Sequence, residues 1–111
     1  MIASMEYQPR VVLIGHSYIR RLRDFMSQSQ STYANLGLRE AAVECFGVGG
    51  ASISANSCRR IDRVVDMCAC RGADVAVLHI GENDYGRISP EAAAQLIHEY
   101  ALSLIQRYSI R

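Results

Sequence analysis

The chain has 111 residues, half of them hydrophobic, and 12 Lys and Arg against 11 Asp and Glu give a formal net charge of +1. This length is typical of one small domain, with enough apolar residues for a core without disulfide or metal staples. A nearly neutral chain with no long basic block is not expected to bind nucleic acid. No apolar run reaches the roughly 18 residues of a membrane span, and the start of the chain lacks the apolar core of a signal peptide. We therefore expect a globular protein with no membrane contact, for which a cytoplasmic location is favoured.

The sequence contains four cysteines but no Cys-x-x-Cys pair; they are Cys45, Cys58, Cys68 and Cys70. We interpret them as reduced, small apolar side chains, with Cys45 and Cys68 at core-facing positions. Metal binding would need Cys and His at convergent ligand spacing, and Cys68-x-Cys70 alone is a weak signal. The sequence therefore predicts no metal site and no cofactor.

The first predicted element is a strand over residues 11–14, an apolar run that stops at Gly15. Such a run is typical of a strand buried on both faces. Ser17 follows at a corner between this strand and an amphipathic helix, whose apolar residues are Ile19, Leu22 and Met26. The polar run at residues 27–32 predicts that the helix ends there.

A second strand is predicted over residues 41–46, and it leads into a glycine-rich loop, Gly47-Val48-Gly49-Gly50. Asn56 or Ser57 is expected to cap a second helix. Its apolar residues are spaced at i, i+3, i+4 and i+7, namely Ile61, Val64, Val65 and Cys68. Gly72 stands where a glycine C-cap belongs.

A third apolar strand is predicted over residues 74–80, ending at Gly81. Ser89 and Pro90 then form a cap and first-turn pair for a third helix. Its apolar stripe consists of Leu96, Ile97, Tyr100, Ala101, Leu104, Ile105 and Tyr108. Alternation of strands and helices predicts an α/β fold, a parallel sheet with helices on both faces.

Three loops leave the carboxyl ends of these strands, where open α/β sheets bind ligands. They carry Ser17, the Gly49-Gly50 pair and Asn83-Asp84, respectively. Acyl transfer needs a nucleophilic hydroxyl, donors for the developing oxyanion, and a base. Ser17 can supply the hydroxyl and one amide donor, Gly50 an unobstructed backbone amide, and Asn83 a carboxamide donor.

The three loop motifs resemble those of the SGNH (GDSL-like) hydrolase family. Residues 11–22, with Gly15-His16-Ser17, resemble block I; Phe46-Gly47-Val48-Gly49-Gly50 resembles block II; and Ile80-Gly81-Glu82-Asn83-Asp84 resembles block III. The resemblance implies a flavodoxin-like three-layer sandwich and hydrolysis of a small-molecule ester. It also implies that Ser17 is the nucleophile and that Gly50 and Asn83 are oxyanion donors.

Two features depart from the family pattern. His16 stands where the family usually has aspartate, and no aspartate here has a histidine three residues later, where the family carries its base. The neighbouring His16 is expected to point away from Ser17, His79 to pack between sheet and helix, and His98 to lie away from the strand ends.

We expect residues 1–10 to be an N-terminal extension. Residues 11–111 are expected to form an incomplete hydrolase-like domain, truncated to about three strands and three helices, weak or inactive by itself.

Several alternatives stay open. A serine at such a corner is commonly a helix N-cap. The chain could also be a non-catalytic remnant or binding module that keeps the oxyanion pocket. A nucleotide-binding module is a distant third, because Gly47-x-Gly49-x-x-Ser52 lacks the last glycine of the dinucleotide motif and follows the second strand. An uncovered sheet edge would allow self-association.

Overall fold

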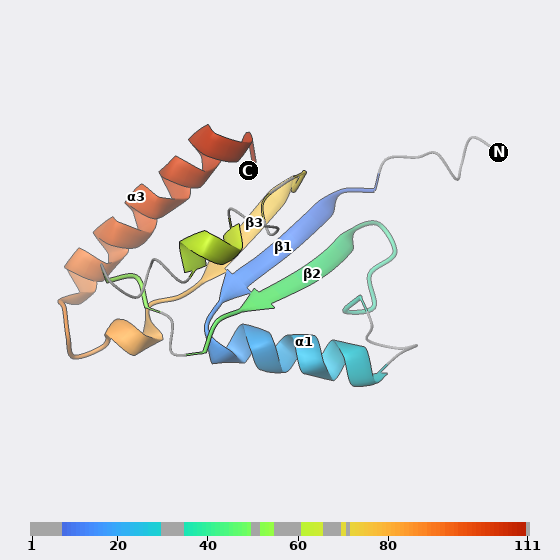
Figure 1. Cartoon of the computed structure of the whole chain (residues 1–111), viewed down its shortest axis with the longest axis horizontal. Coiled ribbons are helices and arrows are strands. Elements are labelled where there is room, and N and C mark those ends of the chain that lie inside the picture. The colour runs from blue at the N-terminus through green and yellow to red at the C-terminus, as the bar shows by residue number, and fades with distance from the viewer. Residues whose placement is uncertain are drawn as a thin grey trace.

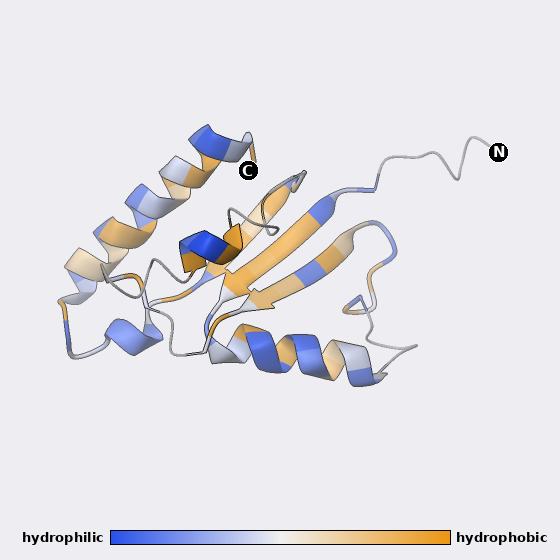
Figure 2. Cartoon of the chain, viewed as in Figure 1, coloured by the Kyte–Doolittle hydropathy of each residue, from blue (hydrophilic) through white to orange (hydrophobic). Residues whose placement is uncertain are grey.

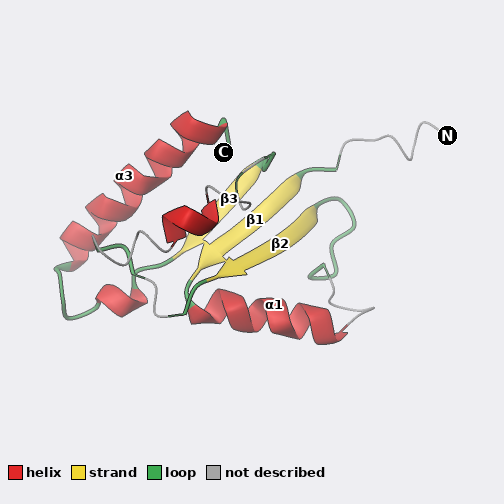
Figure 3. Cartoon of the chain, in the orientation of Figure 1, coloured by secondary structure: helices red, strands yellow, loops and turns green. Residues whose placement is uncertain are grey.

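The computed structural model describes residues 8–29, 35–49, 52–54, 61–65, 70 and 72–110. These residues form an α/β fold of flavodoxin-like arrangement, in which a parallel sheet lies between two helical layers (Figure 1). The arrangement of helices, strands and loops is shown in Figure 3. The α/β class expected from the alternating pattern is confirmed.

Three strands make up the sheet in the described part of the chain: β1 (Arg10–Gly15), β2 (Ala42–Gly47) and β3 (Val75–His79). Their order is β2-β1-β3, and both pairings are parallel. In this register Gly15 pairs with Gly47 on one side and with His79 on the other. The carboxyl ends of all three strands therefore meet at one edge of the sheet.

The two faces of the sheet pack against different helices. Helix α1 (Ser17–Ser29) covers one face and contributes Ile19 and Met26, which pack around Cys45 of β2. The opposite face packs against α3 (Pro90–Tyr108) and the helical segment at residues 61–65. The core on that side includes Val12, Ile14, Ile61, Val65, Leu104 and Ile110. Figure 2 shows the strands as largely apolar bands, whereas both helices have mixed faces.

Two glycines at strand ends allow neighbouring backbones to approach closely, Gly15 against β3 and Gly47 against α1. A Cβ at Gly15 would lie 2.2 Å from the carbonyl oxygen of His79, and one at Gly47 would lie 2.3 Å from the backbone nitrogen of Arg20. Neither glycine is among the residues with positive φ. They are required here because the backbones approach closely, and not because the chain needs a left-handed turn.

Helix α3 begins as the sequence predicts. Ser89 is its N-cap, with the side chain accepting from the backbone nitrogen of Ala92, and Pro90 is its first residue. Asp62, in the segment at residues 61–65, accepts hydrogen bonds from the Tyr100 hydroxyl at 3.0 Å and from the Arg107 guanidinium at 2.8 Å. These bonds hold α3 to that segment across the sheet face.

Other sequence predictions have mixed outcomes. The three strands lie within one residue of their expected bounds, and α1 ends in the expected polar run. The apolar stripe of α3 predicts that Ile105 is buried, but its side chain is 45% exposed, whereas the neighbouring Leu104 is 2% exposed. The buried face of α3 is therefore centred on Leu104. Cys45 and Cys70 are buried, free thiols, and burial raises the pKa of each. The expected cap at Asn56 or Ser57, together with Cys58 and Cys68, lies outside the described residues.

None of the helices in the described ranges is long and apolar enough to pass through a membrane.

Replacing Leu104 by alanine should destabilise the fold strongly. Leu104 is 2% exposed in the core beneath α3. Its loss leaves a cavity, and we expect the free energy of unfolding to fall by about 2–5 kcal/mol. Urea denaturation followed by circular dichroism measures the change. Leu102→Ala, on the same helix but 45% exposed, should change it by less than about 0.5 kcal/mol, and equal effects would refute the assigned core face.

Candidate active site

The start of α1 is capped by a histidine. His16 accepts at its carbonyl from the backbone nitrogens of Ile19 and Arg20, at 3.1 and 3.3 Å. Its ring nitrogen Nδ1 accepts from the backbone nitrogen of Tyr18 at 3.1 Å. These are the bonds that an N-cap residue makes. The N-cap alternative considered for Ser17 is therefore wrong: Ser17 is the first residue of α1, and His16 does the capping.

The His16 ring is buried, with 3% of the side chain exposed, and both of its nitrogens are engaged. Because Nδ1 accepts from an amide, the ring proton lies on Nε2, and Nε2 donates to Glu82 Oε2 at 2.5 Å. Neither nitrogen is available to take a proton from Ser17. The expectation that His16 is not the base agrees with this geometry.

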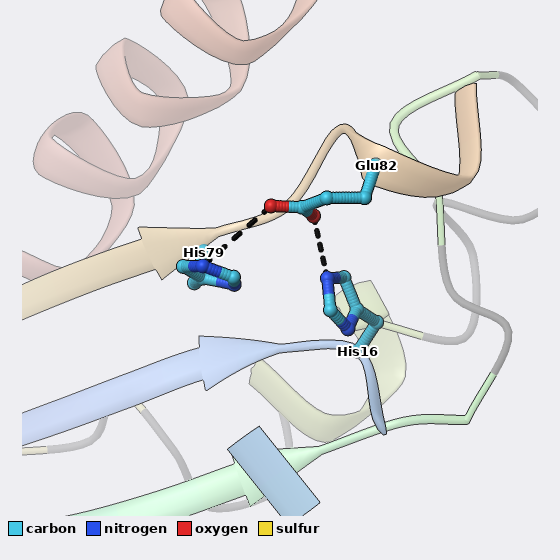
Figure 4. A group of neighbouring side chains, drawn as sticks. All are labelled: His16, His79 and Glu82. Carbon is cyan, nitrogen blue, oxygen red and sulfur yellow. Dashed lines mark hydrogen bonds and ion pairs between the residues drawn. The ribbon is translucent and has the colours of Figure 1, made fainter. Parts of the chain in front are cut away.

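Glu82 joins the loop after β1 to the loop after β3, as Figure 4 shows. It lies at the start of the short helix η3 (Glu82–Asp84), and its other carboxylate oxygen is 3.5 Å from His79 Nε2. Burial by itself would raise the pKa of Glu82. Hydrogen bonds from its own backbone amide and from His16, together with the two imidazoles, outweigh this and hold the pKa below its ordinary value. An aspartate at position 16 would instead place a second carboxylate beside Glu82.

His79 does not pack between sheet and helix as expected. Its side chain is 46% exposed, and its ring lies 5.2 Å from that of His16 and 6.0 Å from that of Tyr18, centroid to centroid. Side chains alternate along a strand, so His79 lies on the face of β3 opposite Leu78, which packs in the core beneath α3. His98 is exposed on α3. His79 is therefore the histidine that combines exposure with a position at the carboxyl edge.

Asp84 anchors the loop that follows the glycine-rich motif. It is 1% exposed, and its carboxylate accepts from the backbone nitrogens of Ile53 at 2.8 Å and Ser54 at 3.1 Å. Burial would raise its pKa, but these amides and the hydroxyls of Ser54 and Ser52 more than compensate and hold the pKa below its ordinary value. The aspartate of the Gly-x-Asn-Asp motif thus ties residues 52–54 to η3.

The structure places two of the three predicted site residues at the same edge. Ser17 begins α1, just beyond the end of β1 at Gly15, and Asn83 lies in η3, in the segment that follows β3. Their neighbours His16 and Glu82 form the 2.5 Å contact, which brings the two segments together. Gly50, the third, lies outside the described residues. The role of Glu82 was not expected from sequence, because it occupies the variable position of its motif, 66 residues from His16.

A pocket of about 620 Å³ lies beside η3, between the loop at residues 85–89 and the first turns of α3. Most of its lining is apolar, and it includes Gly81, Tyr85, Ile88, Ala93 and Ile97. This volume falls in the range of small-molecule sites.

No family model matches the chain, and no curated protein or solved structure matches it either.

Replacing Asp84 by asparagine should destabilise the protein and flatten its acid response. The carboxamide keeps one acceptor but turns an NH₂ group toward backbone amides, which should cost about 1–3 kcal/mol at pH 7. Because folding lowers the pKa of Asp84 below the ordinary value of an aspartate, the carboxylate stabilises the fold above that ordinary value, and this stabilisation is lost as pH falls through the folded pKa. Urea denaturation at pH 7 and pH 3 should therefore show a smaller difference for Asp84→Asn than for the wild type.

The matched control is Asp24→Asn on α1, because the Asp24 side chain is 57% exposed and 3.7 Å from Arg23. Its effect should stay within about 0.5 kcal/mol. A similar loss from both substitutions would contradict the anchoring role of Asp84.

Replacing His16 by alanine should lower the free energy of unfolding by about 0.5–2 kcal/mol through loss of the cap alone. His16→Asn keeps a good capping side chain, so it should recover part of this loss. Thermal and urea unfolding measure both variants. If His16→Asn is no more stable than His16→Ala, capping is not what the His16 ring provides.

Proposed function

We propose that the chain is a serine esterase or acylhydrolase of the SGNH type, with Ser17 as nucleophile. The observation that carries the proposal is the cap: His16 satisfies the first turn of α1, so the Ser17 hydroxyl is not needed there. Within the described part of the chain, that hydroxyl has no hydrogen-bond partner. Ser17 also stands at the positive end of the helix dipole, which favours a developing oxyanion.

The surroundings of the glycine-rich loop support the oxyanion roles of Gly50 and Asn83. On one side of Gly50, the backbone nitrogen of Val48 donates to the carbonyl of Gly15 at 2.8 Å. On the other side, residues 53 and 54 donate to Asp84, the neighbour of Asn83. The described residues on either side of Gly50 are thus bonded to the segments that carry Ser17 and Asn83. This supports the proposed roles because stabilisation of an oxyanion requires preorganised donors.

The proposed substrate is a small-molecule ester. The pocket of about 620 Å³ has room for one, and its apolar lining suits an acyl or alkyl group; Ser17 does not line it, but Gly81 and Asp84, on either side of Asn83, do. A serine hydroxyl needs a base to be a good nucleophile at neutral pH. Since both nitrogens of His16 are engaged, we expect turnover by these 111 residues to be slow.

The engagement of both His16 nitrogens also favours a second candidate, a non-catalytic module that binds a carbonyl ligand in the oxyanion pocket.

A second copy of the chain is a further proposed partner. β3 is an edge strand of the described sheet, and Val77 on it is 45% exposed. Such an edge can pair with another strand.

A fluorophosphonate probe, which reacts with activated serine hydroxyls, tests the proposal. The wild-type chain should be labelled at one serine and should hydrolyse a p-nitrophenyl ester slowly, and Ser17→Ala should lose both properties. Labelling should be unchanged in Ser27→Ala, whose hydroxyl lies in α1 and donates to the Arg23 carbonyl. Loss of the Asn83 donor in Asn83→Ala should slow hydrolysis by about 10²–10³-fold.

Hydrolysis that survives in Ser17→Ala would refute the nucleophile. Absence of labelling and turnover in the wild type, together with saturable binding of an ester or acid, would favour the binding module.

A further inference from the structure

Two histidines and one glutamate lie together at the carboxyl edge of the sheet, one from the turn after β1 and two from the stretch that joins β3 to η3 (Figure 4). His16 follows β1, His79 ends β3 and Glu82 begins η3, and one potential ligand atom from each lies within 4.8 Å of the other two. Two imidazoles and a carboxylate are a ligand set that binds zinc while leaving a coordination position open. We propose that His16, His79 and Glu82 form a site for a divalent transition-metal ion of the zinc class.

The distances between ligand atoms are compatible with such an ion after small movements. Bonds of about 2.0–2.1 Å in tetrahedral geometry place neighbouring ligand atoms roughly 3.4 Å apart. His79 Nε2 and Glu82 Oε1 are already 3.5 Å apart, whereas His16 Nε2 and Glu82 Oε2, at 2.5 Å, must separate. Glu82 and His79 are about half exposed and can adjust, while the His16 ring is buried and serves as the fixed ligand.

Metal binding requires the proton on the His16 ring to change its position. Without an ion, the proton lies on Nε2, between the ring and Glu82. An ion at Nε2 requires this proton to move to Nδ1, so the ring stays neutral and binds the metal through the Nε2 lone pair. Nδ1 then no longer accepts from the Tyr18 amide. Metal binding therefore replaces both hydrogen bonds of the His16 ring, the one to Glu82 and the one from the Tyr18 amide, by a metal–nitrogen bond.

The ligand chemistry selects the class of ion. Imidazole nitrogen suits zinc, cobalt, nickel and copper, whereas magnesium and calcium prefer oxygen ligands in larger numbers. The proposed site has two nitrogen donors and one carboxylate. It should therefore bind Zn²⁺ and Co²⁺ but not Mg²⁺. The site does not use the Ser17 hydroxyl, so it does not depend on the proposed esterase function.

Isothermal titration of the full 111-residue chain, freed of metal by a chelator, with Zn²⁺ and with Co²⁺ tests the site. We expect one ion per chain for both metals and no binding of Mg²⁺. Removing a ligand in His79→Ala or Glu82→Gln should weaken binding by at least about tenfold, since even loss of a supporting contact costs that much. His98→Ala, which removes the third histidine of the sequence, should bind as the wild type does. Ser17→Ala should also bind normally, whatever its effect on labelling or hydrolysis.

Two spectroscopic measurements identify the ligands. The absorption spectrum of the Co²⁺ form should lack thiolate charge-transfer bands, because no cysteine belongs to the proposed site. NMR of the imidazole nitrogens should show the proton of His16 moving from Nε2 to Nδ1 on Zn²⁺ binding, with a shift of the Tyr18 amide. Absence of binding in the wild type, equal affinity in His79→Ala, or a thiolate band would overturn the proposal.

Discussion

The contact between His16 and Glu82 organises the functional edge of this protein. A buried imidazole donates to a carboxylate on the neighbouring loop at 2.5 Å, and the same ring caps α1 through its other nitrogen. One side chain thus fixes the start of a helix and joins the loops after β1 and β3. It also joins the chain neighbours of Ser17 and Asn83.

A second carboxylate completes the arrangement from the other side of η3. Asp84 is buried yet charged, which is stable only because backbone amides of residues 53 and 54 solvate it in place of water. Glu82 and Asp84 point to different loops from the two ends of the same short helix. The short helix η3, which follows β3, is therefore bonded to the segments that follow β1 and β2.

Histidine at position 16, where SGNH hydrolases usually have aspartate, has a local physical role in this structure. Aspartate and histidine can both cap a helix through an acceptor atom, but only histidine also donates to Glu82. Histidine in place of aspartate keeps the helix cap beside Ser17, and both of its ring nitrogens are then engaged in hydrogen bonds. This favours a structural role for His16 over a role as the base for Ser17.

Much of the fold follows from local pattern. The apolar runs ending at Gly15 and Gly47, and the Ser89-Pro90 pair before an apolar stripe, predict strands and a helix start because these signals act over a few residues. The placement of Ser17 and Asn83 at the carboxyl edge follows from parallel strand order. Ile105 was misjudged because a stripe indicates which residues can be buried, but not how the helix is rotated against the sheet.

The sequence by itself determined the fold class, the strand positions and the three loops at one edge, since hydrophobic periodicity and glycine placement are local properties. Only the tertiary structure decided which residue caps α1, that His79 is exposed, and that Glu82 meets both histidines. These outcomes depend on contacts between residues up to 66 positions apart. Such contacts arise from the register of β1 with β3 and the close approach at Gly15, which no local pattern encodes.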